Sequence, residues 1–296
     1  MNVLWNSAIG LLIVTGGLLG LSLPFSKIGT AAGVPAIVWA LLISVGAGSV
    51  LLAALLARGE RPRLTPHKLR YFFITAAVSY AIPNLLMFSA IQHLGAGYAG
   101  IMFTLSPVIT LLLSVLSGVR RPNTLGIAGI VVGFVGAVMV AWTRGEAGQP
   151  AALFWVMIGL LLPVSLALGN IYRTADWPEG AGPIELAAGS QLAAAAMLLA
   201  GTLVMTGVAS IETLANVPLV ATAQFVSAAV MFAFFFRLQA VGGPVYLSQI
   251  GYVAAAVGLV SGTLYMGERY EAMTWLGALV IVVGVFMTTS AQARKI

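Results

Sequence analysis

Long apolar runs, each about the length of a membrane-spanning helix, recur along almost the whole chain. Crossing a bilayer takes about 20 mostly apolar residues, and ten such runs can be placed in the 296 residues. The predicted spans are 5–26, 34–57, 70–92, 96–118, 124–143, 151–172, 184–206, 216–237, 243–266 and 272–290. The chain is 60% hydrophobic and only 7% charged, against roughly 25% charged in soluble domains. We therefore predict an all-α polytopic membrane protein with ten transmembrane helices.

The basic residues predict how the chain is oriented. Ten spans place both termini on one side, and that side collects eleven lysines and arginines against three on the other. Cytoplasmic loops carry the excess of basic residues, so both termini are predicted to be cytoplasmic, in the cell inner (plasma) membrane. The net charge of +6 is then a property of the loops and does not indicate a nucleic-acid partner.

The two halves of the sequence resemble each other. "IGLL" at 9–12 recurs at 158–161, and "LGIAGIVVG" at 125–133 is answered by "LGALVIVVG" at 276–284. We predict two repeats, 1–147 and 148–296, with five helices each. An odd number of helices makes the second repeat enter the membrane from the opposite face. Inverted repeats are typical of secondary transporters, which bind their substrate near the bilayer midplane between the repeats.

Two local motifs resemble a known family. "YMGERYEAMTWLGALVIVVGV" at 265–285 is similar to a Gly-Glu turn leading into a last helix, and "ALGNIYRTADWP" at 167–178 is similar to a sixth-helix end. Together with the ten-helix pattern, they resemble the EamA-type branch of the drug/metabolite transporter superfamily. Within it, the chain is most similar to exporters of aromatic and other neutral amino acids. The resemblance implies a carrier for small molecules.

Polar and aromatic residues share helix faces within several spans. Tyr80, Asn84 and Met87 have the spacing of one helix face, and an amide that faced lipid would be costly. The alternative is that these side chains only form hydrogen bonds between helices, worth about 0.6 kcal/mol each. The predicted substrate-binding residues are Tyr80, Asn84, Tyr98, Met102, Asn170, Gln224, Ser227, Met231, Gln249 and Tyr252.

Three prolines and one carboxylate are further candidates. Pro83, Pro107 and Pro163 lie within spans, where a missing backbone N–H lets a helix bend. They are predicted hinges, or else static kinks. No ionisable residue is predicted at the middle of a span, so Glu268, near a span end, is the candidate for proton coupling. The other interpretation is a facilitator that needs no coupling ion.

The residue inventory opposes catalysis. The chain has no cysteine and two histidines, and it has no phosphate-binding loop or metalloprotease motif. We predict no enzyme activity, no cofactor and no metal site.

The predicted function is export of amino acids or related small metabolites by alternating access, by a monomer or homodimer. Carriers of cationic drugs such as quaternary ammonium compounds, or of nucleotide-sugars, are the alternatives within transport. A channel and a non-transporting scaffold or sensor are the alternatives outside carrier transport.

Overall fold

The computed structural model describes residues 5–60, 64–116, 124–143, 145–146 and 149–293. Almost all of them are helical, as predicted. In chain order the elements are α2 (Ala8–Ala31), α3 (Ala36–Ala57), α4 (Pro66–Thr75), the π-helix η1 (Ala76–Ala81), α5 (Ile82–Leu94), α6 (Ala96–Phe103), α7 (Ser106–Leu116), α8 (Thr124–Thr143), β1 (Gly145–Glu146), β2 (Gln149–Pro150), α9 (Leu153–Ala175), α10 (Pro183–Met205), the 3₁₀-helix η2 (Val208–Asn216), α11 (Pro218–Ser248), α12 (Ile250–Tyr265) and α13 (Ala272–Ala293). β1 and β2 form a two-residue antiparallel pair.

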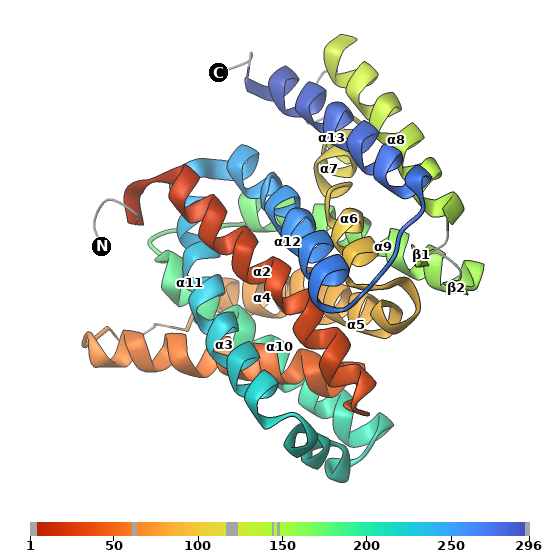
Figure 1. The fold of residues 1–296 in the computed structure, drawn as a ribbon. Helices are drawn as coiled ribbons and strands as arrows, with labels where there is room; N and C mark the ends of the chain where they lie inside the picture. The colour runs from red at the N-terminus through yellow and green to blue at the C-terminus, as the bar shows by residue number, and fades with distance from the viewer. Residues whose placement is uncertain (1–4, 61–63, 117–123, 144, 147–148, 294–296) are drawn as a thin grey trace.

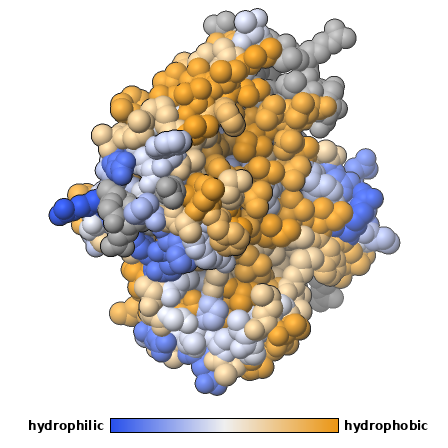
Figure 2. Space-filling model, turned by 90° about the vertical axis from the view of Figure 1, so that its right-hand side faces the viewer, coloured by the Kyte–Doolittle hydropathy of each residue, from blue (hydrophilic) through white to orange (hydrophobic). Residues whose placement is uncertain are grey.

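Seven stretches of helix in the described residues are long and apolar enough to cross a membrane. They are Ala8–Ala31, Ala36–Ala57, Pro66–Leu94, Thr124–Thr143, Leu153–Ala175, Pro183–Met205 and Pro218–Val241. Three shorter apolar stretches, Ala96–Thr110, Ile250–Tyr265 and Ala272–Gly284, fall where spans four, nine and ten were predicted. Figure 2 shows apolar side chains over much of one face, with hydrophilic residues in separate patches. The fold is that of a polytopic membrane protein.

The predicted boundary between spans eight and nine, at 238–242, is wrong. α11 continues as one helix from Pro218 to Ser248, and α12 begins at Ile250. Gly242 and Gly243 lie within α11, and each disfavours a helix by only about 1 kcal/mol. Burial outweighs that preference, because Leu238 and Leu247 of α11 both pack in one cluster with Leu11 of α2.

The helices pack in pairs that join the two halves of the sequence. The most extensive contacts are those of α8 with α13, α3 with α10, and α6 with α12. α8 and α13 lie side by side (Figure 1) and approach so closely that a Cβ on Gly136 would come 2.8 Å from the carbonyl oxygen of Gly277. Small residues therefore allow this contact between backbones. Figure 1 also shows the beginning of α2 and the end of α13 on the same side of the bundle.

Candidate functional site

A cavity of about 80 Å³ lies among helices of both halves of the chain. Its walls come from α2, η1, α5, α6, α7, α9, α11 and α12. The lining runs from Leu19, near the middle of α2, to Arg173, two residues before α9 ends at Ala175. The cavity thus extends from the centre of the bundle toward the end where α9 terminates.

Pro83 shapes the wall that η1 and α5 provide. The backbone N–H of Ile82 bonds to the carbonyl of Ala77, five residues back, which is π-helical geometry. The carbonyl of Val78 would need the next N–H, at position 83, which proline lacks. The hydroxyl of Ser165 on α9 donates to that carbonyl at 2.8 Å instead. A π-helical turn often marks a functional site, and this one places Ser79 and Tyr80 at the cavity.

The structure brings five of the predicted residues to this cavity. Tyr80 and Met231 are buried at its wall, Asn84 and Asn170 are partly buried, and the predicted hinge Pro83 lies beside Asn84. Tyr80 packs edge-on against Phe232, with ring centroids 5.1 Å apart. Phe235, whose ring is 6.0 Å from that of Phe232, extends the aromatic wall.

The other predicted residues are not among those that line the cavity. Tyr98 is fully buried and its hydroxyl donates to the carbonyl of Val140 on α8 at 3.0 Å. Gln224 donates to the hydroxyl of Ser22 on α2 at 3.0 Å, so it joins two helices. The remaining members of this group are Met102, Ser227, Gln249 and Tyr252, together with the predicted hinges Pro107 and Pro163. Helical spacing shows which residues share a face but does not show what that face contacts.

Arg173 is the charged residue among the described cavity residues that sequence reasoning missed. The predicted span 151–172 ended one residue before it and so placed it in a loop, but α9 extends through it and it is 2% exposed. Its guanidinium donates to Asn170 Oδ1 at 2.6 Å and to Gln239 Oε1 at 3.4 Å. It also lies over two rings, 5.0 Å from the centroid of Phe235 and 5.9 Å from that of Tyr80.

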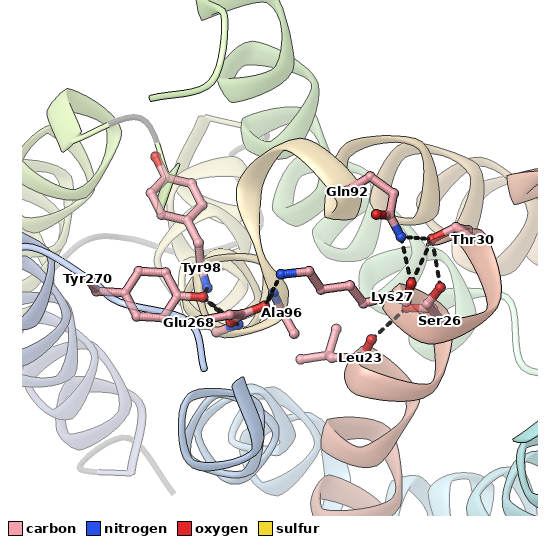
Figure 3. A network of polar contacts seen from close by, with 10 residues as sticks. Leu23, Ser26, Lys27, Thr30, Gln92, Ala96, Tyr98, Glu268 and Tyr270 are labelled. Carbon is pink, nitrogen blue, oxygen red and sulfur yellow. Dashed lines mark hydrogen bonds and ion pairs between the residues drawn. The ribbon is translucent and has the colours of Figure 1, made fainter. Parts of the chain in front are cut away.

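The opposite end of the bundle is held by a second polar cluster, which contains Glu268. His93, at the end of α5, stacks on Trp155, at the start of α9, with centroids 4.1 Å apart. Glu268 bonds to the start of α6, which begins two residues after the end of α5, the helix that carries His93. Glu268 therefore lies near the start of α9, whereas Arg173 lies near its end. The Glu268 carboxylate accepts hydrogen bonds from Lys27 Nζ at 2.6 Å, from the amides of Ala96 and Gly97, and from the Tyr270 hydroxyl (Figure 3).

This cluster, which we call the Lys27–Glu268 network, ties α2, α6 and the α12–α13 loop together. It also contains Gln92, whose amide donates to the carbonyl of Lys27 and to the hydroxyl of Thr30. The carboxylate sits at the first turn of α6, where free N–H groups favour a negative charge. Burial would raise the pKa of Glu268, but the hydrogen bonds from Lys27, Tyr270 and the two amides lower it below its ordinary value. Glu268 is therefore ionised at neutral pH in this conformation.

A third polar cluster lies just beyond the cavity end of α9. Asp176 accepts a bond from Tyr172, and two from Arg70 at 2.8 and 3.1 Å, and lies 3.0 Å from His67 Nε2. These contacts, that of Tyr172 first, lower the pKa of the Asp176 carboxyl. Asp176 is thus already engaged by its own neighbours. No group of three or more potential metal ligands occurs within the described ranges.

Comparison with known proteins agrees with this architecture. Residues 6–142 match the model of the EamA-like transporter family. No curated protein sequence matches the chain significantly. Among 27 matching chains of solved structures, one, described as "Crystal structure of protein", is 20% identical, with a TM-score of 0.62 over 96% of this chain and 98% of that chain. At this identity the likeness shows the fold alone.

The family match and the apolar helices both fit a polytopic membrane protein. The matched segment covers somewhat less than half of the chain, from α2 to α8 apart from its last residue. Residues 6–142 are therefore similar to the EamA-like transporter family.

Proposed function

We propose that this protein exports aromatic and other neutral amino acids, or closely related metabolites, across the cell inner membrane by alternating access. The observation that carries the proposal is the cavity among helices of both halves, lined by amides and aromatic rings, with polar contacts closing the end opposite to it. Sites for small molecules combine mostly apolar walls with a few polar groups that fix orientation. This cavity has that composition.

The helix pairing supports a five-plus-five inverted repeat over 1–147 and 148–296. The predicted repeat makes α3 the counterpart of α10, α6 of α12, and α8 of α13. These are the pairs with the most extensive contacts, as expected for counterparts that meet across a pseudo-two-fold axis in the membrane plane.

The conformation of the two ends supports alternating access. The Lys27–Glu268 network joins three segments at one end, whereas the cavity extends toward the end of α9. If the basic side is cytoplasmic, as the positive-inside rule predicts, the cavity is on the cytoplasmic side. That is the state in which an exporter loads its substrate.

Counterflow in proteoliposomes tests the proposal. Vesicles with purified protein are preloaded with an unlabelled amino acid, and labelled tracer is added outside without a proton gradient. We expect transient tracer accumulation that saturates with substrate, and its loss in Asn84→Ala, whose amide lines the cavity. Asn216→Ala is the matched control, because Asn216 bonds to the carbonyl of Ala32 outside the cavity.

The outcomes separate the alternative functions. Flux without saturation or counterflow would indicate a channel. Absence of flux with every amino acid, in folded protein, would refute the substrate class and leave cationic drugs, nucleotide-sugars or a non-transporting role. Equal rates with and without a proton gradient would indicate a facilitator.

A further inference from the structure

Arg173 stands apart from every other residue of the cavity wall. Among the described residues that line the cavity, it is the only one with a charged side chain. It is also 2% exposed, within a helix that is long and apolar enough to cross a membrane. A charged residue placed inside a membrane segment is costly and usually has a specific partner or a function. The charge of Arg173 therefore requires either a partner of opposite charge or a function.

The contacts of Arg173 with the described residues give its charge no carboxylate partner. Its hydrogen-bond acceptors, Asn170 and Gln239, are neutral amides, and its other neighbours are the rings of Tyr80 and Phe235. No ion pair between Arg173 and a carboxylate occurs in the described part of the chain. The nearest acid along the sequence, Asp176, pairs with Arg70.

Contacts that are already made also fix the orientation of the guanidinium. The bonds to Asn170 and Gln239 use two of its five N–H donors, one on Nη2 and one on Nε. The planar donor fork suits a carboxylate, which accepts two parallel hydrogen bonds from arginine. We propose that Arg173 binds the carboxylate of the transported substrate, so that the substrate class is monocarboxylates with an apolar or aromatic body.

The remainder of the wall fits the other parts of such a molecule. Tyr80, Phe232 and Phe235 offer ring faces and edges to an apolar body next to the carboxylate. Ser79 Oγ and the Tyr80 hydroxyl are buried and have no hydrogen-bond partner among the described residues. They are available to polar substrate atoms. Because no acid lines the described wall, an ammonium group gains no ion pair, and the carboxylate dominates recognition.

This proposal rests on the proposed function only in taking this cavity as the substrate site. It is tested by measuring how four related compounds bind to purified protein in detergent. The compounds are phenylalanine, 3-phenylpropionate, phenylalaninamide and phenethylamine, measured by isothermal titration calorimetry. The first two carry a carboxylate and the last two lack one. We expect the carboxylates to bind about 10- to 100-fold more tightly than the other two, the range for losing a charge-assisted hydrogen-bond pair.

Substitutions at Arg173 assign that preference to one side chain. Arg173→Gln should lower the affinity for both carboxylates about 10- to 100-fold and leave that for phenethylamine unchanged or higher. Arg173→Lys keeps the charge and should retain part of the affinity. Arg237→Gln is the matched control. Arg237 also donates to an asparagine, Asn6, and lies over the ring of Trp5, but it does not line the cavity. Thermal unfolding and size exclusion identify variants that fail to fold, and Arg173→Lys provides the folded comparison.

The results distinguish this proposal from the proposed function. Tight binding of 3-phenylpropionate that depends on Arg173, without counterflow of any amino acid, would support the anion site and refute amino-acid transport. Amino-acid counterflow with equal affinities for phenylalanine and phenethylamine, or with Arg173→Gln unchanged, would overturn the anion site alone.

Discussion

Under the proposed alternating-access mechanism, replacing Glu268 with glutamine should open the end of the bundle that the Lys27–Glu268 network joins. The carboxylate is fully buried and accepts bonds from Lys27 at 2.6 Å, from Ala96 at 2.7 Å and from Gly97 at 3.1 Å. Glutamine keeps the shape but has one acceptor oxygen and no charge. It can satisfy only some of these donors and cannot form the ion pair.

The size of the effect follows from the burial of the pair. Removing one member of a buried ion pair costs about 3–5 kcal/mol, and the 17% exposure of the Lys27 side chain lowers that figure to about 2–3 kcal/mol. The network joins α2, α6 and the α12–α13 loop, so it must separate when this end opens. The cost therefore falls on the closed state and should shift the equilibrium toward the open state about 30- to 150-fold.

Thiol labelling measures this shift directly, because the chain has no cysteine. Leu23→Cys places a reporter one turn below Lys27 on α2, at a fully buried position. A membrane-impermeant maleimide should label it much faster in the Glu268→Gln background. Glu185→Gln is the matched control, since Glu185 pairs with Lys68 at 2.5 Å away from this network. An unchanged or slower labelling rate in Glu268→Gln would refute the view that the network closes this end.

Three further predictions concern the Lys27–Glu268 network, the Asp176 cluster and the cavity wall. The pKa values of Glu268 and Asp176 are lowered, so the stability that these carboxylates contribute is complete above their ordinary pKa values and is lost as the pH falls through the lowered values. The melting temperature should therefore be flat from pH 5 to 8 and fall below about pH 4. A decline already between about pH 7 and 5 would contradict this. Gly262→Ala should speed labelling of the Leu23→Cys reporter, because the added Cβ would clash with the Glu268 carboxylate; an unchanged rate would refute it. Gly169→Ala should lower stability by about 1–3 kcal/mol in chemical unfolding, because its Cβ would clash with Ser79 on η1, whereas Gly17→Ala, whose Cβ meets nothing within 4 Å, should not.

The sequence predicted the class of fold because one physical constraint dominates it. Backbone groups in a bilayer must be satisfied within helices or closed barrels, so apolar runs of sufficient length become helices whatever their neighbours. The helix ends depended on weaker local preferences. Burial of Leu238 and Leu247 was able to override the predicted break within α11, and no local pattern shows which leucine will be buried.

One of the predicted residues at the cavity, Asn84, had a second feature of the sequence beside it. Asn84 follows Pro83, and the missing N–H of the proline is linked to the π-helical turn that places Tyr80 at the wall. Tyr98 and Gln224 have the same kind of spacing, but their polar atoms bond to α8 and α2. Spacing alone does not separate a residue that binds substrate from one that joins two helices.

Arg173 was missed for a different reason. It lies three residues before Asp176, in a charged stretch that resembles a loop, and its helix continues past it to Ala175. The segment "NIYRTAD" at 170–176 contained a usable signal. Asn170 and Arg173 are three residues apart and share a helix face, and Asn170 was already a predicted substrate-binding residue. An amide on a predicted cavity face followed by arginine at this spacing indicates a guanidinium held toward that cavity.

The two ends of the bundle differ in how their buried charges are satisfied, and this difference gives them different roles. At one end Lys27 and Glu268 are satisfied by each other and by the start of α6, so this pair needs no ligand, and under the proposed mechanism its formation would stabilise closure. At the other end Arg173 meets only neutral groups among its described contacts, so a bound carboxylate would be favourable there. A substrate can shift a conformational equilibrium only by binding one state more tightly than the other. Under the proposed mechanism, Arg173 would be the cavity group whose interaction with substrate can differ most between the two states, and the Lys27–Glu268 network would set the equilibrium that the substrate has to shift.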